Sequence, residues 1–200
     1  MAIRKIVHYG EPSLREPSKE VHKVSKKITE LVRDLMDTMY AQNGVGLAAP
    51  QIGENVRVFV IDVSTNNEPL NPMVFINPKI IKKSGAIKSN EGCLSFPEAY
   101  TDVKRYKNIM VKALNEHGKP FVLEAKDGSL LARAIQHEKD HLDGVLFIDH
   151  CINRFETEEV LKKHNLPSLD PDLLVDEKEL EEEIAKNDSN SIFWDPWYWA

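Results

Sequence analysis

The stretch that decides the fold of this chain is Leu130-Leu131-Ala132-Arg133-Ala134-Ile135-Gln136-His137-Glu138-Lys139-Asp140-His141-Leu142-Asp143-Gly144. It predicts a helix over 130–142, because Asp127 or Ser129 can cap its start and Gly144 can end it. The apolar residues of its first turns predict that the helix is buried. A buried helix that carries histidines and carboxylates is costly unless these groups have partners.

His137 and His141 lie one helical turn apart, so both imidazoles can face a single metal ion. Glu138 lies beside that face, where its carboxylate can take a proton from a water at the metal. Hydrogen-bonded core histidines are the alternative, but the cost of burying these groups favours metal ligation. Two imidazoles leave a tetrahedral site incomplete, so a third ligand is required.

The third ligand decides what kind of enzyme this is. In a general zinc peptidase it would lie downstream, where the candidates are His150, Glu156, Glu158 and Glu159, none of them in an extended glycine-containing motif. Upstream, Glu91-Gly92-Cys93-Leu94-Ser95 offers the thiolate of Cys93, a strong ligand for divalent transition metals. Taken alone, Cys93 can equally be a small buried apolar residue.

A third segment consists of small residues, Gly44-Val45-Gly46-Leu47-Ala48-Ala49-Pro50-Gln51. Such a segment lets the backbone approach a ligand or another chain closely. Gln51 adds a side-chain amide donor at its end. The segment lacks the Gly-Lys-Ser/Thr ending of a phosphate-binding loop, so nucleotide binding is not indicated.

Together, segments 44–51, 91–95 and 136–141 resemble the peptide deformylase family. That family is marked by a Gly-x-Gly-x-Ala-Ala-x-Gln segment, a Glu-Gly-Cys-x-Ser segment and a Gln-His-Glu-x-Asp-His segment, and all three stand here in that order. The opening segment 6–15 is also similar, so the resemblance covers roughly residues 3–155. It implies an α+β fold with mixed or antiparallel sheets around a central metal-binding helix that carries the His-Glu-x-x-His motif.

The resemblance implies that Cys93, His137 and His141 hold one divalent metal per chain. Ferrous iron is the family's usual metal, and zinc, nickel or cobalt can replace it; a thiolate and two imidazoles suit all of these. The implied reaction is hydrolysis of the N-formyl group from formyl-methionyl nascent peptides, with release of formate. Glu138 is implied as the general base. The Gln51 amide and the Leu94 backbone N–H are implied as donors to the negative charge that develops on the formyl oxygen.

The substrate is expected to lie extended, paired with backbone near Val45, Gly46 and Gly92. Leu130, with Val45 and the helix face around Ala134, is our candidate for the methionine slot, although core packing would explain these residues equally well. Arg105 matches an arginine common in the family and is expected to pair with Glu91 and so steady the cysteine loop. A solvated arginine is the alternative.

Two positions depart from the family pattern. Pro97-Glu98 stands where many members have Pro-Gly, which bears on loop shape. Tyr100 stands where some members carry an arginine that meets the downstream peptide, so the peptide preference beyond methionine is left open.

The rest of the chain predicts an α+β domain. Apolar residues at helical spacing predict a helix over 23–40 with one buried face. Runs rich in Val, Ile and Phe predict strands over 57–63 and 73–81. Pro72 and Pro78 either limit the second strand or place it at a sheet edge. Segments 109–115 and 121–125 read as a hairpin. We expect a catalytic domain over 1–165 and an acidic extension over 166–200 that ends in tryptophans.

Composition and charge exclude several classes. No apolar run reaches the ~20 residues that span a bilayer, the start lacks the pattern of a secretory signal, and two cysteines make no disulfide framework. We therefore expect a cytoplasmic protein. The resemblance implies a bacterial one, because formylated chains arise there, with a mature organelle enzyme as the alternative and the ribosome as a candidate partner. Bulk charge does not favour nucleic-acid binding, since residues 1–154 carry 22 basic and 19 acidic groups.

The C-terminal part of the chain is strongly acidic, with 13 Asp and Glu against 4 Lys over residues 155–200. Its three tryptophans fall within 193–199, and we expect this segment to dock on an apolar patch of its own chain or of a second subunit. Two rival functions remain: a general zinc peptidase, which needs neither Cys93 nor Gln51, and a binding module that has lost its chemistry, which has no need of Glu138.

Overall fold

The computed structural model describes residues 2–65, 68–175 and 178 of the chain. Five strands form one antiparallel sheet in the order in which they follow in sequence: β1 (Gly46–Ala48), β2 (Val58–Ile61), β3 (Met73–Cys93), β4 (Phe96–Leu114) and β5 (Pro120–Ala125). The helices are α1 (Lys26–Ala41), α2 (Leu130–Asp143) and α3 (Arg154–Lys163). The α+β prediction is confirmed, and the sheet is antiparallel throughout the described strands.

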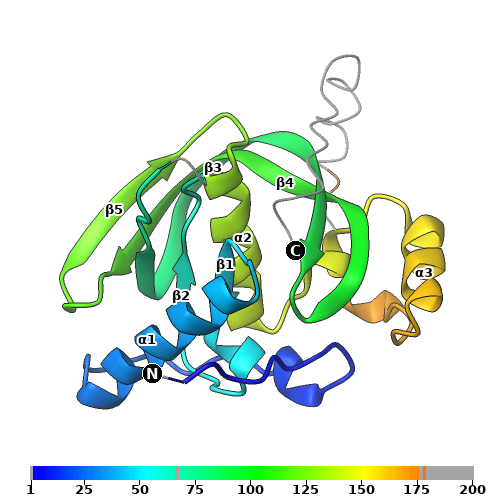
Figure 1. Cartoon of the computed structure of the whole chain (residues 1–200). Helices are drawn as coiled ribbons and strands as arrows, with labels where there is room; N and C mark the ends of the chain where they lie inside the picture. Colours follow the sequence, from blue (N-terminus) through cyan, green and yellow to red (C-terminus); the bar gives the residue numbers. More distant parts are fainter. Residues whose placement is uncertain (1, 66–67, 176–177, 179–200) are drawn as a thin grey trace.

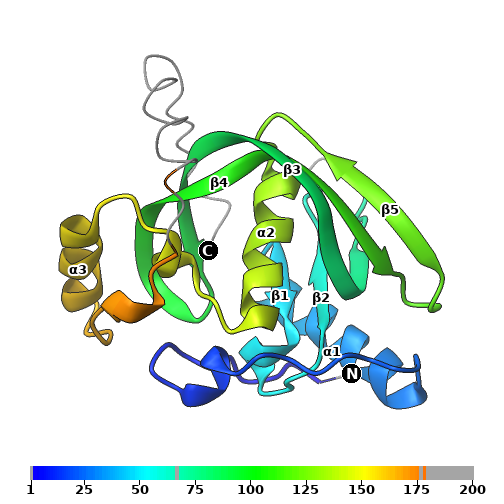
Figure 2. The same cartoon turned by 180° about the vertical axis from the view of Figure 1, so that it is seen from behind.

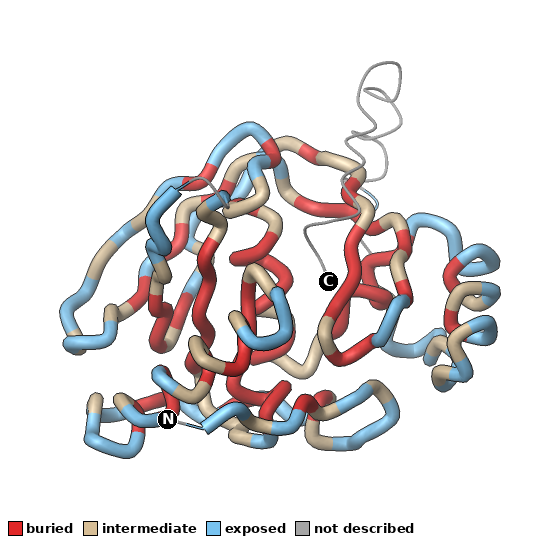
Figure 3. The backbone as a smooth tube through the Cα atoms, in the orientation of Figure 1, coloured by how far each residue is buried: buried red, intermediate tan, exposed pale blue. Residues whose placement is uncertain are grey.

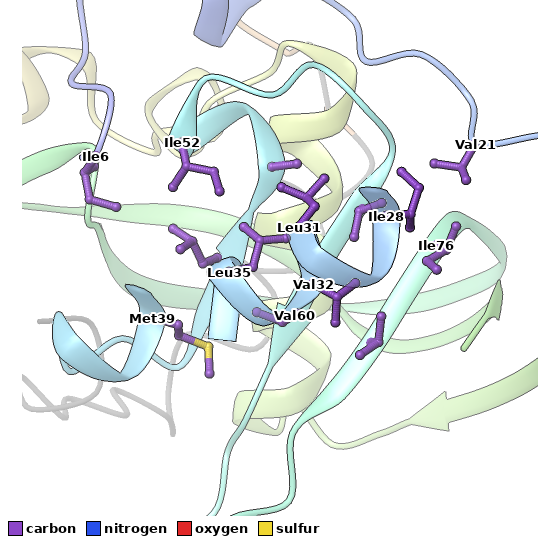
Figure 4. Packing of buried hydrophobic residues seen from close by; sticks show 14 residues of the cluster. Ile6, Val21, Ile28, Leu31, Val32, Leu35, Met39, Ile52, Val60 and Ile76 are labelled. Carbon is purple, nitrogen blue, oxygen red and sulfur yellow. The ribbon is translucent and has the colours of Figure 1, made fainter. Parts of the chain in front are cut away.

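Helix α1 covers one side of the sheet. Its buried residues Leu31, Val32 and Leu35 recur at helical spacing, as the sequence predicts, and pack toward Val60 of β2 and Ile76 of β3 (Figure 4). The helix begins three residues later and ends one residue later than the predicted span. Its end leads directly into the small-residue segment that forms β1, so its packing fixes where that segment lies.

The β3–β4 hairpin is much longer than the sequence predicts. The expected end of β3 at residue 81 is wrong, because the strand continues to Cys93 and pairs with β4 from Ile76 to that end. Pro78 falls where the register shifts between Ile76 and Lys79, so its missing N–H is accommodated there. The polar and glycine-containing residues after 81 carry little strand signal of their own. They are held by cross-strand pairing that periodicity cannot reveal.

Helix α2 stands at the centre of the molecule, and the β3–β4 ribbon arches over it (Figures 1 and 2). Ser129 caps its start by accepting a hydrogen bond from the Ala132 N–H, and Gly144 ends it with φ of +74°. A side chain at Gly144 would overlap the Arg15 backbone, so only glycine fits. Buried residues are concentrated on α2 and the strands beside it (Figure 3). This confirms the prediction that the helix is buried.

The described part of the chain beyond α2 packs back on the body through η3 (Phe147–His150), α3 and η4 (Pro171–Leu173). Leu166 and Leu169 contact the cluster around Phe96, and the Tyr9 hydroxyl donates to the Ser168 carbonyl at 3.1 Å. The tryptophan segment 193–199 lies outside the described residues. Across the part of the chain that the structure describes, no helix combines the length and apolarity needed to cross a membrane.

Candidate metal centre

Three side chains from distant parts of the sequence meet at one point. Cys93 lies at the end of β3, while His137 and His141 lie one turn apart on α2. One ligand atom from each, the thiol sulfur and two ring nitrogens, lies within 4.8 Å of the others, and all three residues are buried. The Cys93 Sγ lies 3.3 Å from the His141 Nε2. The structure thus brings together the three residues predicted as metal ligands.

The residues present fit a divalent transition metal. A thiolate and two imidazoles are a donor set that several such metals accept. Beside them lies the carboxylate of Glu138, whose buried Oε2 has no hydrogen-bond partner among the described residues. A buried carboxylate oxygen without a partner is costly, and a cation or a polar ligand at the three donors would offset that cost.

Burial makes the charged forms of these groups expensive. Burial and then the charge of Glu138 raise the pKa of the Cys93 thiol well above its ordinary value. Burial and then the charge of Glu91 raise the pKa of the Glu138 carboxyl well above its ordinary value. A divalent cation would favour the thiolate, because a nearby positive charge lowers the pKa of a thiol.

A charge network behind the helix orients His137. The Glu91 Oε2 lies 3.0 Å from the His137 Nδ1, which leaves Nε2 as the nitrogen that can act as a ligand. Arg105 donates from Nε to the Glu91 Oε1 at 2.9 Å and from a terminal nitrogen to Oε2 at 2.7 Å. Although burial alone would raise it, the charge of Arg105 lowers the pKa of Glu91 to about 2. The predicted pair of Glu91 and Arg105 is therefore present, and the same Glu91 contacts His137. That the pair steadies the cysteine loop stays a prediction.

Asp140 and His150 extend this network. The same Arg105 donates to the Asp140 Oδ2 at 2.5 Å, and the His150 Nε2 lies 3.1 Å from that oxygen. His150 was a candidate third metal ligand, but here it contacts a carboxylate. Sequence reasoning gave Asp140 no role. The position of Asp140 within the pentad, on the opposite side of α2 from Glu138, was the sequence feature that could have indicated this role.

The other downstream candidates lie on α3 or its start, away from the three donors. Glu158 accepts a hydrogen bond from the Leu169 N–H at 2.7 Å, and the side chains of Glu156 and Glu159 are exposed. Among the described residues, the group that could hold a metal is Cys93, His137 and His141. Of the third ligands considered, the geometry therefore favours Cys93.

Gln51 is held rigidly beside Cys93. Its Oε1 accepts from the Ala48 N–H at 2.8 Å, which turns its amide nitrogen toward the cysteine. That nitrogen donates to the Cys93 Sγ and the Ser95 Oγ, each at 3.3 Å. Gln51 belongs to η2 (Ala49–Ile52), whose start follows directly on β1, so the small-residue segment fixes the amide's direction.

These residues enclose a pocket of about 10 Å³, room for roughly one water molecule. Its lining comes from the three predicted segments: Gly44, Val45, Gly46, Gln51, Gly92, Cys93, Leu94, His137 and Glu138. A side chain at Gly46 would overlap the Glu138 carboxylate, which explains the glycine there. Leu130 is not part of this lining; it lies half-buried at the start of α2, and its assignment to a methionine slot stays a prediction.

A wider groove of about 340 Å³ adjoins the pocket, because Cys93 and Leu94 line both. Its remaining lining is Ile6, His8, Gln42, Phe96, Pro97, Glu98 and Tyr100. The two positions that depart from the family pattern, Glu98 and Tyr100, therefore face this groove. Tyr100 also lies against Gly92, where a Cβ would overlap its ring.

Comparisons with known proteins agree with this geometry. The family model described as polypeptide deformylase matches residues 3–157. Peptide deformylase 1 of Clostridium acetobutylicum is 50% identical over 149 residues, which are 74% of this chain and 95% of that protein. Peptide deformylase of Baumannia cicadellinicola is 47% identical over 163 residues, 82% of this chain and 95% of that protein.

Solved structures of peptide deformylases are also similar to this chain. A peptide deformylase from Synechococcus elongatus in complex with actinonin has a TM-score of 0.76 at 38% identity, covering 88% of this chain and 95% of that one. A Met-Ala-Ser-bound peptide deformylase from Acinetobacter baumannii has a TM-score of 0.69 at 30% identity, covering 74% and 98%. Since the family model spans most of the chain and the relatives match nearly their full length, this chain belongs to the peptide deformylase family and is an enzyme of that class.

Proposed function

We propose that this chain hydrolyses the N-formyl group of N-terminal formyl-methionine in newly made polypeptides and releases formate. One observation carries the proposal: a buried Cys-His-His donor set lies in a pocket of about 10 Å³ beside an unpartnered carboxylate oxygen of Glu138. The family's activity supports the same conclusion. Cys93 and Gln51 have no place in a general zinc peptidase, yet both lie at the centre of this site.

Cys93, His137 and His141 would hold one divalent metal. Ferrous iron is the proposed resident metal, and zinc, nickel or cobalt would bind the same donors. Bound there, the cation would supply a Lewis acid that lowers the pKa of water and polarises the formyl carbonyl. The protein's part is to keep the three donors together and to fix the His137 ring through Glu91.

Glu138 would move the proton. Its carboxylate lies in the pocket beside the three donors, and Gly46 leaves room for it because glycine has no side chain. Glu138 would accept a proton from the attacking water and deliver it to the amine that leaves. A carboxylate in this position can both take and return a proton.

Gln51 and the Leu94 backbone N–H would donate to the formyl oxygen as negative charge develops there. Both residues line the pocket, and Gln51 is already oriented by its bond from Ala48. A preoriented donor costs little reorganisation when the charge forms, and one such donor is typically worth about 3–4 kcal/mol of barrier.

The peptide would enter extended between two backbone segments. Val45 and Gly46 line one side of the pocket and Gly92 lines the other, so a substrate strand could pair with both. Beyond the methionine, the chain would run along the groove past Tyr100. The Acinetobacter baumannii relative bound to Met-Ala-Ser supports a peptide that begins with methionine.

The setting follows from the substrate. We propose that the enzyme works in the bacterial cytoplasm, where formylated chains arise, and that the ribosome is a partner. The catalytic unit is proposed as residues 1–165, which include every residue given a role at the site. The extension over 166–200 is proposed as a separate module.

Replacing the third ligand separates this function from its rivals. Cys93→Ala should abolish both metal retention and formate release from formyl-Met-Ala, because two imidazoles alone hold a divalent metal weakly. A general zinc peptidase would keep its activity in that variant. A module without chemistry would release no formate even as the metal-loaded wild-type protein.

A further inference from the structure

Phe147 contacts both parts of the chain that supply the metal ligands. It opens η3 and is 2% exposed. The centroid of its ring lies 5.7 Å from that of the His137 ring, with the two ring planes at 32°. The same ring packs against Phe96, with centroids 4.9 Å apart and planes at 85°. Phe96 pairs with Cys93 across the turn between β3 and β4, and Cys93, Phe96 and Phe147 belong to one buried cluster. Phe147 therefore links a ligand of α2 with the turn that carries Cys93.

The contact between Phe147 and His137 restricts a motion that the hydrogen bond of His137 leaves free. The Glu91 Oε2 contacts only the Nδ1 of the ring. A ring held at one atom can still tilt about that bond, and the tilt changes where Nε2 points. A second ring at an attractive centroid distance, about 4.5–7 Å, opposes such a tilt. Phe147 is not among the residues that line the pocket of about 10 Å³, so it acts on the metal centre through its neighbours.

Asp149 in turn holds Phe147 in place. Its Oδ2 accepts a hydrogen bond from the Leu146 N–H at 2.7 Å, which closes the turn that contains Phe147. Both oxygens of the buried carboxylate also accept hydrogen bonds from the two terminal nitrogens of Arg15, one of them at 3.0 Å. A two-point bond of this kind is stronger and more directional than a single hydrogen bond. Arg15 belongs to η1 (Pro12–Arg15), so a segment near the start of the chain fixes the turn behind the metal centre.

We propose that Phe147 is a positioning residue of the metal centre. Its ring holds the His137 imidazole at the tilt that metal binding requires, and the pair of Arg15 and Asp149 holds Phe147. The inference rests on the metal binding that the proposed function needs. The alternative is that Phe147 only fills the core, in which case it contributes to stability and leaves the metal unaffected.

Cobalt release from the full-length, cobalt-loaded protein separates these two roles. Phe147→Leu keeps an apolar side chain and removes the ring, so it should lose cobalt to a chelator about tenfold faster than wild type or more. Its visible absorption spectrum should change as well, because the ligand-field bands of Co²⁺ depend on the geometry of the ligands.

Phe75→Leu is the matched control. Phe75 is also buried, and its ring contacts within the described part of the chain are Phe59 and Phe121, neither of them a ligand. This variant should lower thermal stability and leave cobalt release and the spectrum unchanged. Equal cobalt release by Phe147→Leu and wild type, or an equal increase in Phe75→Leu, would overturn the proposal. Neither of these results affects formate release by the wild-type protein, whereas a wild-type protein that binds no cobalt would refute the proposed function as well.

A double-mutant cycle tests whether Asp149 acts through Phe147. Asp149→Asn keeps an oxygen that can accept from Leu146 but loses the charge toward Arg15, so it should speed cobalt release on its own. In the Phe147→Leu background it should add no further increase, because the ring that it positions is already gone. Increases that multiply in the double variant, or no increase in Asp149→Asn alone, would contradict this part of the proposal.

Discussion

At the residue scale, the site depends on close fits between neighbours in space. Gly46 and Glu138 are far apart in sequence, yet the carboxylate occupies the volume that any Cβ at Gly46 would need. Gln51 is similarly held between Ala48, Cys93 and Ser95. The sequence predicted which residue types meet here, because three motifs carried them. It could not predict these contacts, since they depend on how β1 lies against α2.

Gly46→Ala should therefore displace the Glu138 carboxylate and lower the rate of deformylation. A displacement of about 1 Å can cost roughly a hundredfold in rate. Gly53→Ala is the matched control: nothing lies within 4 Å of its Cβ, but its φ of +80° disfavours alanine. That variant should lose about 1 kcal/mol of stability while its kcat is unchanged. Full activity of Gly46→Ala would show that Glu138 does not need its observed position.

Glu91→Gln should weaken metal retention without changing the ligands. The amide keeps the size of the carboxylate but loses its charge toward His137 and Arg105. Removing a partner that orients a ligating histidine typically costs about 10–100-fold in metal affinity. Competition with a chelator would measure this loss. Unaltered affinity, with thermal stability reduced, would mean that Glu91 serves the fold alone.

At the element scale, the elements with strong local signals were predicted well. Helix α2 has a cap, apolar first turns and a terminal glycine, and it forms within one residue of the predicted span. The strands β3 and β4 were predicted only in part, because residues 82–93 and 96–108 form strands through their mutual pairing. Cys93 stands at the end of that unpredicted hairpin, so its motif, and not its secondary structure, identified it.

The contacts of Asp62, which connect α1, β1 and β2, predict how the stability of the fold depends on pH. Asp62 is buried and accepts hydrogen bonds from Tyr40, Ser64 and the Asn71 N–H. Although burial opposes it, the Ser64 hydroxyl and these other donors lower the pKa of Asp62 below its ordinary value. A lowered pKa stabilises the fold above the unfolded value and loses that contribution as the pH falls through the folded value.

Asp62→Asn should accordingly cost about 1–3 kcal/mol of unfolding free energy at neutral pH. The difference from wild type should shrink as the pH falls below about 4, where Asp62 of the unfolded chain becomes protonated, and it should be smallest once the pH is also below the lowered pKa of the folded chain. Urea unfolding at several pH values measures this. A difference in unfolding free energy that stays constant with pH would show that the charge of Asp62 does not stabilise these contacts.

At the scale of the whole molecule, the sequence predicted one catalytic body and an acidic extension. The family match over residues 3–157 lies within the predicted body of 1–165, and the division into body and extension stays a prediction. The grouping of Lys83, Lys104 and Lys139 around one pocket of about 290 Å³ was not predictable, because these residues come from three different elements.

The central claim is that this chain removes formyl groups by means of a metal held at Cys93, His137 and His141. The most direct measurement is anaerobic metal analysis coupled to a formate-release assay on the same sample, because iron bound by a thiolate is oxygen-sensitive. We predict about one iron per chain and formate release from formyl-Met-Ala, with Glu138→Gln keeping the metal and losing the activity. A fully metal-loaded protein that releases no formate, or a Glu138→Gln variant as active as wild type, would contradict the account.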